Sequence, residues 1–341
     1  MFGKIFSYRI DQQKIIINFE EKVGIVEILT PAIIRLREEK VSSFSVKPDL
    51  IQEEVKFETK LENGILTIDT PLYTYKINDN FKLKVFQGNS LISDEVDYLE
   101  RETHHFNLDI LEKEGHKADR NQKEHLVMIN KVVDPSDTFY GLGDKAGFLN
   151  KRGYEYEMWN TDDPSPHCDH YKSLYKSIPF FTVMNDNYVY GFFFDNTYKQ
   201  YYDMAKTNQE IVQIAFDKGL FNYYFIGGSS LKEVVSNYTL ITGRTPLPQR
   251  FTLGYQQCRW SYMDKEEFMD VAHKMREYHI PCDTLFLDID YMDHYKVFTT
   301  SEEHFPNFKG MVDELKTLGF KLVTIIDPGV KVEDHYNIYE E

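Results

Sequence analysis

The spacing of apolar residues changes once along the 341-residue chain, near Pro248, and this change limits the folds that the chain can adopt. Before Pro248, short apolar segments follow one another with turn residues between them. After it, apolar segments alternate with stretches whose apolar residues recur at helical spacing. The first pattern is typical of an antiparallel β-sandwich and the second of parallel β/α units. We therefore predict a sandwich domain over residues 1–248 and a β/α domain over residues 249–341.

The amino-terminal part is expected to consist of short strands joined by tight turns. Asn63-Gly64 and residues 185–187 separate apolar segments, and both are typical of hairpin turns. Strands are predicted over 15–19, 23–29, 65–68, 73–77, 81–86, 180–184, 188–194, 211–216 and 223–226. A helix is predicted over 231–241, ahead of a rigid, proline-containing connector. The charged stretch 94–123 has little apolar periodicity, so we expect an exposed excursion to which no function is assigned.

The carboxyl-terminal part is expected to alternate strands and helices. Strands are predicted over 253–258, 284–289 and 321–326, with a helix after each of the first two. Asp264 and Glu267 have the spacing of a capping box before the first helix, and Gly319 follows the second. Such units form a parallel sheet, either doubly wound or a (β/α)8 barrel. A full barrel takes about 250 residues, so we expect only its first three β/α units here, as a piece of a larger protein.

Charge and cysteine content narrow the range of partners. The formal net charge of -16 at pH 7 argues against nucleic acids and anionic membrane surfaces, which attract cationic proteins. Cys168, Cys258 and Cys282 lack the pattern of a disulfide framework or a zinc site, and we expect no metal and no cofactor. No apolar run reaches the ~18 residues of a membrane span and no leader peptide is evident, so we expect a cytoplasmic protein. The oligomeric state stays open, a homo-oligomer included.

Three acids follow the second predicted parallel strand, where ligands bind in both β/α architectures. They are Asp288, Asp290 and Asp293, and the first two would point the same way if the strand reached them. They could coordinate Mg²⁺, hold sugar hydroxyls, or cap the loop and helix that follow. A D-x-D pattern after an apolar strand also opens haloacid-dehalogenase-type phosphotransferases, which carry Thr or Val two residues after the second Asp. Met292 stands at that place, and this departure speaks against a phosphotransferase.

Five motifs resemble those of glycoside hydrolase family 31, in the order in which that family has them. FYGLGDKAGFLNKRG (139–153) resembles the sandwich motif of the family, and MWNTDDP (158–164) resembles its substrate loop. LGYQQCRWSY (253–262), PCDTLFLDIDYMD (281–293) and IIDPGV (325–330) resemble the first three barrel strands. Residues 1–138 match only in being rich in strand patterns. The resemblance implies a galactose-mutarotase-like sandwich followed by the first units of a (β/α)8 barrel, which is incomplete in this chain.

The resemblance implies sugar-binding roles for five residues of the barrel part. Asp288 resembles the carboxylate that accepts a hydrogen bond from an outer hydroxyl of the terminal sugar, and Ile289 resembles an apolar wall beside it. Trp260 resembles an aromatic residue at the pocket edge, and a packed core Trp is the alternative. Ile325 and Asp327 resemble third-strand residues that line the pocket floor.

In the sandwich part, Asp162 resembles the acid that this domain of the family extends over the barrel mouth. Asp163 would take that place if the register were shifted by one, and an Asx turn or helix cap before Pro164 is the structural alternative. Histidines next to loops are more often surface or structural residues than ligands. This applies to His167, His170 and His294.

The activity that the resemblance implies is that of a retaining α-glucosidase, which removes terminal α-linked glucose from oligosaccharides. Retaining glycosidases need two carboxyl groups about 5–5.5 Å apart, one as nucleophile and one as acid/base. In the family both lie on later barrel strands, so we expect them beyond Glu341 and predict no catalytic residue in this chain.

The D-I-D-Y-M form of the second strand resembles the glucosidase branch of the family rather than its α-xylosidases. It favours malto- or isomalto-oligosaccharides as substrates and leaves the linkage preference open. Two alternatives to an enzyme fragment of this kind remain. They are a non-catalytic carbohydrate-binding module and a Mg²⁺-dependent phosphotransferase that uses Asp288 and Asp290.

Overall fold

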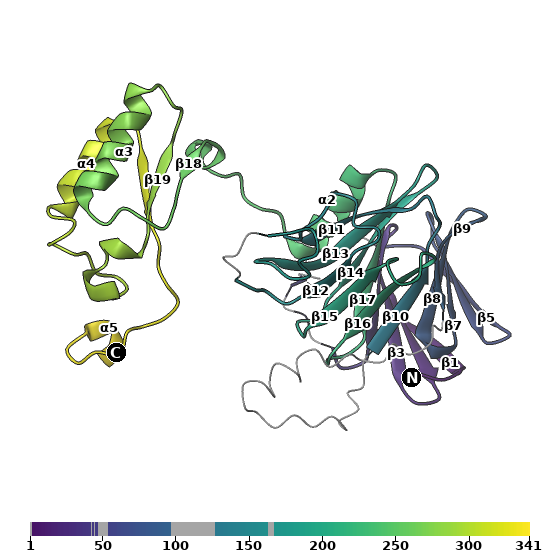
Figure 1. Ribbon diagram of the computed structural model, residues 1–341. Helices are drawn as coiled ribbons and strands as arrows, with labels where there is room; N and C mark the ends of the chain where they lie inside the picture. Colours follow the sequence, from purple (N-terminus) through teal and green to yellow (C-terminus); the bar gives the residue numbers. More distant parts are fainter. Residues whose placement is uncertain (1, 42, 44, 47–53, 97–126, 163–166) are drawn as a thin grey trace. The chain divides into compact units, whose positions relative to one another are not determined.

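The computed structural model describes residues 2–41, 43, 45–46, 54–96, 127–162 and 167–341 (Figure 1). They form two compact units, which divide between Arg244 and Thr245. The predicted excursion over 94–123 lies outside the described residues from position 97 onward. Within the described ranges, no helix combines the length and the apolar character that crossing a bilayer requires.

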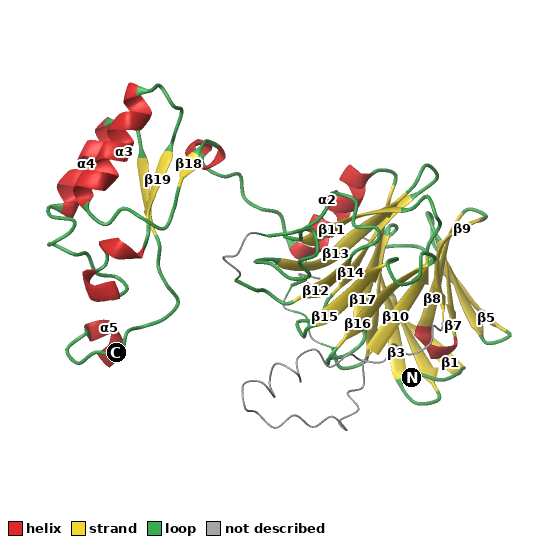
Figure 2. Ribbon diagram, in the orientation of Figure 1, coloured by secondary structure: helices red, strands yellow, loops and turns green. Residues whose placement is uncertain are grey.

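The first unit consists of two antiparallel sheets that face each other (Figure 2). In the described part, one sheet has the order β1 (Ile5–Asp11), β2 (Lys14–Phe19), β3 (Val23–Thr30), β4 (Ile33–Glu38), β17 (Asn222–Gly228), β14 (Val189–Phe194), β13 (Ser177–Met184) and β11 (Thr138–Gly143). The other has the order β12 (Glu155–Met158), β15 (Gln200–Met204), β16 (Ile211–Phe216), β10 (Val127–Val132), β9 (Ser90–Val96), β8 (Lys82–Gln87), β7 (Thr74–Asn78), β6 (Ile65–Asp69) and β5 (Glu58–Glu62). The predicted sandwich is confirmed.

Aromatic and aliphatic side chains from both sheets form the core between them. The rings of Tyr75 on β7 and Phe225 on β17 have centroids 5.8 Å apart, and both side chains are fully buried. The core also encloses an ion pair, because Lys131 Nζ lies 2.5 Å from Glu95 Oε1. The same Glu95 oxygen accepts a hydrogen bond of 2.7 Å from the hydroxyl of Tyr223. Burial lowers the pKa of Lys131, and the charge of Glu95 opposes this shift, so the buried charge has a partner of opposite sign.

Turn chemistry and helix caps explain how the strands are connected. Asn63 and Gly64 have φ of 50° and 78°, as a type I′ turn requires, and they join β5 to β6 in the predicted hairpin. The predicted helix after β17 is α2 (Leu231–Thr242), whose N-cap Ser230 accepts a hydrogen bond from the backbone N–H of Glu233. This helix packs on the outer face of the sheet that contains β14 and β17.

The second unit has a parallel three-stranded sheet with the order β18 (Gln256–Gln257), β19 (Thr284–Leu287) and β20 (Lys321–Thr324). Helices α3 (Lys265–Glu277) and α4 (Phe308–Thr317) lie side by side on one face of this sheet, and a short helix, α5 (Asn337–Glu340), ends the chain (Figure 2). The core of the unit contains Phe268 and Ala272 from α3, Met311 and Leu315 from α4, and Leu285 and Leu287 from β19. The predicted alternation of strands and helices is confirmed.

The predicted ends of the three parallel strands were wrong. The first strand was expected over 253–258, but the structure has a 3₁₀ helix over Arg250–Leu253 and only two strand residues, Gln256 and Gln257. Local hydrogen bonds, such as that from the N–H of Gly254 to the carbonyl of Phe251, replace strand pairing there. The other two strands each end two residues earlier than expected, at Leu287 and Thr324.

Candidate functional site

The carboxyl ends of the three parallel strands meet at one edge of the second unit. Thr284 of β19 pairs with Gln256 of β18 on one side and with Lys321 of β20 on the other, so the strands are in register and end side by side. Loops at this edge are the usual place for ligands in parallel α/β folds. Five of the six predicted site residues follow these strand ends. Trp260 follows β18, Asp288 and Ile289 follow β19, and Ile325 and Asp327 follow β20.

Asp288 is held at the end of β19 by its own backbone turn. The chain turns after Leu287 into the 3₁₀ helix η4 (Ile289–Tyr291), and Asp288 Oδ1 accepts a hydrogen bond of 2.8 Å from the N–H of Ile289. The strand therefore ends before the acids, and the alternation expected for Asp288 and Asp290 does not apply. Asp288 therefore caps the turn that follows it, which is one of the three roles considered above. This cap occupies one of the two carboxylate oxygens.

The end of β18 lies near the same carboxylate. Partial desolvation raises the pKa of the Cys258 thiol, although the residue is exposed, and the negative charge of Asp288 raises it further. Cys258 precedes Trp260 by two residues, and because β18 pairs with β19, the segments that follow these two strands start next to each other. Trp260 is 77% exposed in this chain, so it does not belong to the core of the second unit as the structure describes it.

The neighbouring acids have different environments. Asp290 Oδ1 accepts a hydrogen bond of 3.2 Å from the hydroxyl of Tyr295, whereas its Oδ2 is buried and has no hydrogen-bond partner among the described residues. Asp293 contacts two cationic or ionisable groups, Lys296 Nζ at 2.9 Å and His294 Nδ1 at 2.6 Å. These two contacts lower the pKa of Asp293, that of Lys296 more than that of His294. Both partners of Asp293 belong to its own loop, so its contacts stabilise the conformation of that loop.

The position of Ile325 is fixed through its backbone. Its N–H donates to the carbonyl of Leu287 at 3.0 Å, and its carbonyl accepts a hydrogen bond of 2.9 Å from the hydroxyl of Tyr291. Its side chain is 37% exposed, and Asp327 two residues later is exposed as well. An apolar side chain and a carboxylate are therefore both accessible at the end of β20.

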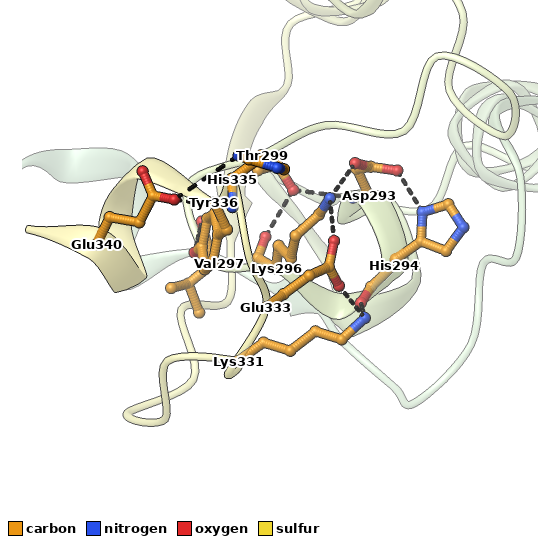
Figure 3. Close-up of polar contacts among 10 residues, drawn as sticks. All are labelled: Asp293, His294, Lys296, Val297, Thr299, Lys331, Glu333, His335, Tyr336 and Glu340. Atoms are coloured by element: carbon orange, nitrogen blue, oxygen red, sulfur yellow. Dashed lines mark hydrogen bonds and ion pairs between the residues drawn. The ribbon is translucent and has the colours of Figure 1, made fainter.

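A polar network joins the loop after β19 to the segment after β20 (Figure 3). Lys296 Nζ lies 3.1 Å from Glu333 Oε1, and Lys331 Nζ lies 2.8 Å from Glu333 Oε2. Lys331 Nζ also donates to the carbonyl of His294 at 3.1 Å. The buried Tyr336 donates its hydroxyl to the carbonyl of Val297 at 2.6 Å. These contacts hold together the two segments that carry Asp288 and Ile325.

Sequence reasoning missed this network. The i,i+3 spacing of Asp293 and Lys296 was a signal for one of its ion pairs. The pair of Lys296 with Glu333 had no such signal, because the two residues meet only when the sheet forms. His294, considered above as a ligand, is exposed and contacts Asp293, which agrees with a surface role.

The sixth predicted residue, Asp162, belongs to the first unit. It is exposed and follows β12, and the loop is held there by a hydrogen bond of 3.0 Å from the N–H of Thr161 to the carbonyl of Leu174. The alternatives that involve Asp163 and Pro164 fall outside the described residues. His167 and His170 are exposed. In the described ranges, no group of three His, Cys, Asp or Glu side chains is arranged to hold a metal ion.

Two family models match the chain, and together they cover most of it. Residues 25–203 match the glycosyl hydrolase 31 N-terminal galactose mutarotase-like domain, and residues 245–341 match the glycosyl hydrolases family 31 TIM-barrel domain. The chain belongs to glycoside hydrolase family 31. Its first unit is the mutarotase-like sandwich, and its second unit is the start of the family's TIM barrel, as the motifs implied.

Two curated relatives of the chain are named as α-glucosidases. Alpha-glucosidase 2 of Bacillus thermoamyloliquefaciens is 41% identical over 232 residues, which cover 68% of this chain and 29% of that enzyme. The α-glucosidase of Saccharolobus solfataricus is 32% identical over 216 residues, which cover 63% of this chain and 31% of that enzyme. The match thus spans less than a third of the length of each of these two relatives.

Solved family-31 structures have the same fold. A dextranase of Flavobacterium johnsoniae, determined with isomaltotriose, is 28% identical and superposes with a TM-score of 0.81 over 96% of this chain and 39% of its own. An α-xylosidase from a soil metagenome has a TM-score of 0.76 over 98% of this chain and 49% of its own. Because its sequence identity is only 17%, this structure shows a shared fold and nothing more.

Proposed function

We propose that this chain carries the sandwich domain and part of the sugar site of a retaining α-glucosidase that removes terminal α-linked glucose from oligosaccharides. The observation that carries the proposal is the strand-end edge, where Asp288 and Trp260 follow adjacent strands of a family-31 barrel. The 41% identity to a Bacillus α-glucosidase supports glucose as the sugar. We assign the division between the sandwich and barrel domains to the connector that ends at Pro248.

Each site residue has a role that its chemistry supports. Asp288 would accept a hydrogen bond from a hydroxyl of the terminal glucose, and a charged acceptor of this kind contributes about 1.5–3 kcal/mol. The exposed ring of Trp260 would stack on the C–H face of the sugar. Ile289 and Ile325 would form apolar walls, with Asp327 orienting the groups at the pocket floor. We propose Asp162 as the contribution of the sandwich domain.

The chemical step requires two carboxyl groups about 5–5.5 Å apart around an oxocarbenium-like transition state. Asp288 caps η4, and Asp293 is engaged by Lys296, so neither is offered as nucleophile. We propose that the nucleophile and the acid/base lie in the part of the family-31 length that these 341 residues do not span. These residues then bind and orient the sugar without cleaving it.

The partners and the location follow from charge and cysteine chemistry. We propose an α-glucoside oligosaccharide as the ligand and neither nucleic acid nor an anionic membrane as a partner, because the net charge is -16. We propose a cytoplasmic location. All three cysteines are free, and two of them, Cys168 and Cys258, are exposed, which suits a reducing compartment.

The experiment is to measure the release of glucose from 4-nitrophenyl α-glucoside and from isomaltose. The 341-residue chain is assayed beside a longer product, which is the protein extended through the rest of its reading frame. We expect activity only in a product that includes the later barrel strands. Activity of the 341-residue chain itself would show that the catalytic carboxyl groups are among the acids described here.

A further inference from the structure

The sandwich has an open strand edge that carries apolar side chains. Among the described residues, one sheet ends in β1 and β11 and the other in β12 and β5. Neighbouring segments cover two of these strands. The N–H of Lys151 donates to the carbonyl of Phe139 on β11 at 2.8 Å, and the N–H of Glu157 on β12 donates to the carbonyl of Lys172 at 2.8 Å. No described strand pairs with the outer side of β1 or of β5, so these two edges are open.

The two open edges differ in how well they are protected. Charged side chains discourage an exposed strand edge from pairing with another chain. Three of the five residues of β5 are charged and alternate along the strand, at Glu58, Lys60 and Glu62. On β1, in contrast, Phe6 is 69% exposed and Ile10 is 49% exposed. The edge that is open and apolar is therefore that of β1.

Ile10 is half-exposed although it points toward the core of the sandwich. It lies opposite Ile15 of β2, which is fully buried, and residues opposite each other on paired strands point to the same face. Two residues earlier, the hydroxyl of Tyr8 contacts Thr59 Oγ1 of β5 at 3.1 Å and closes the gap between the two sheets. Ile10 is exposed because its sheet ends at β1 in the described part of the chain. A further strand on this edge would cover it.

A strand that fits this edge is β1 of a second copy. In an antiparallel pair of β1 strands with the two-fold axis at Tyr8, Phe6 of one copy lies opposite Ile10 of the other. Ser7 lies opposite Arg9 in the same register, so each apolar side chain has an apolar partner and no like charges meet. An axis at Arg9 would place two arginines opposite each other. The axis at Tyr8 is therefore favoured.

The charge around β1 allows two copies to approach each other. The chain carries a formal net charge of -16, so copies repel each other on average. The hairpin of β1 and β2 with its flanking residues departs from this average, because basic side chains slightly outnumber acidic ones. They are Lys4, Arg9, Lys14 and Lys22 against Asp11, Glu20 and Glu21. This edge therefore adds no repulsion of its own.

We propose that β1 is a dimerisation strand, which pairs antiparallel with β1 of a second copy of this chain. The pairing joins the outer sheets of two sandwiches into one continuous sheet, and it is isologous, so it closes at two copies. A single strand edge buries little surface, so the dimer is weak and its population depends on concentration. All residues that pair belong to the first unit, and the dimer does not depend on the proposed sugar site.

The test is disulfide cross-linking at two exposed positions of β1. Ser7→Cys and Arg9→Cys are made separately in a chain whose exposed cysteines, Cys168 and Cys258, are replaced by Ser. Residues directly opposite on antiparallel strands have Cα atoms about 4.5–5.5 Å apart, a separation that a disulfide can bridge. A mixture of the two variants should therefore form covalent dimers under mild oxidation. Either variant alone should form few, because its two cysteines are two residues out of register.

The matched control uses the other open edge. Lys60→Cys and Glu62→Cys have the same spacing on β5, and the two side chains are 68% and 62% exposed. Their mixture should cross-link little. Adding Ile10→Lys to the β1 variants should slow the cross-linking of their mixture about tenfold, because a neighbouring strand would bury the added charge. Thermal unfolding of each variant checks that it is folded.

Two results would overturn the proposal. One is a mixture of Ser7→Cys and Arg9→Cys that cross-links no faster than either variant alone or than the β5 control. The other is cross-linking that Ile10→Lys leaves unchanged in a folded chain. Association through the second unit would produce cross-links at β1 and at β5 alike, and the control detects it. A β1 edge that binds a strand of a different protein would give the first result.

Discussion

The ammonium group of Lys296 lies 3.1 Å from a carboxylate oxygen of Glu333, and this ion pair joins the loop after β19 to the segment after β20. The Lys296 side chain is only 16% exposed, so the pair is better shielded from solvent than most surface pairs. Since Asp288 and Ile325 begin these two segments, their relative position depends on the contact.

Replacing Lys296 with Met should loosen this edge. We expect faster hydrogen exchange in residues 325–336 and only a small loss of stability, as is usual for ion pairs near a surface. The control is Lys309→Met, which breaks an i,i+4 pair with Asp313 on α4 where the lysine is 86% exposed. Exchange in 325–336 that responds equally to both variants would argue against a specific role for Lys296.

The same network should depend on pH. Contacts with Lys296 and His294 lower the pKa of Asp293, and contacts with Lys331 and Lys296 lower that of Glu333. Carboxyl groups whose pKa is lower in the folded state stabilise it fully above the unfolded-state values, about 4. That contribution is lost as the pH falls through the lower, folded-state values. Protection from hydrogen exchange in residues 325–336, taken relative to the intrinsic exchange rate at each pH, should therefore fall below about pH 4, and Lys296→Met should weaken this dependence. A pH profile identical in the variant would contradict the assignment.

Asp288→Asn should weaken the binding of α-glucosides by the longer product without unfolding it. A hydrogen bond from a sugar hydroxyl to a carboxylate contributes about 1.5–3 kcal/mol, which predicts a loss of roughly 10- to 150-fold. The loss is measured by the inhibition constant for glucose and by the Michaelis constant for the nitrophenyl glucoside. Asp270→Asn is the matched control, since Asp270 is an exposed acid on α3 paired with Lys274. Unchanged binding in Asp288→Asn would remove this residue from the site.

Trp260→Ala should separate ligand binding from folding. Because Trp260 is 77% exposed, we expect its removal to change the free energy of unfolding by less than about 1 kcal/mol, while α-glucoside binding weakens. Tyr262→Ala provides the contrast. Tyr262 is 2% exposed and its ring lies 5.2 Å from that of Phe268, so its loss should cost about 3–5 kcal/mol. Chemical denaturation measures both. A comparable loss of stability in Trp260→Ala would return this residue to the core.

Patterns of residues close in sequence predicted most of the fold. The Asn63-Gly64 turn, the Asp264 cap of α3 and the glycine after α4 were all readable, because each depends on local backbone chemistry. Strand ends were less predictable. The apolar residues near Leu253 fitted a strand, yet local hydrogen bonds formed a 3₁₀ helix, and Leu253 is 73% exposed. Apolar periodicity cannot decide between two local hydrogen-bond patterns of similar energy.

The sequence by itself determined the two fold classes, the family and the five candidate residues at the strand ends, because periodicity, turn chemistry and motif order are properties of neighbouring residues. Tertiary structure alone decided which distant residues meet. It placed Lys296 against Glu333 and the hydroxyl of Tyr336 against the carbonyl of Val297. The physical reason is that such contacts depend on strand register and side-chain packing across elements far apart in the chain, which no local pattern records.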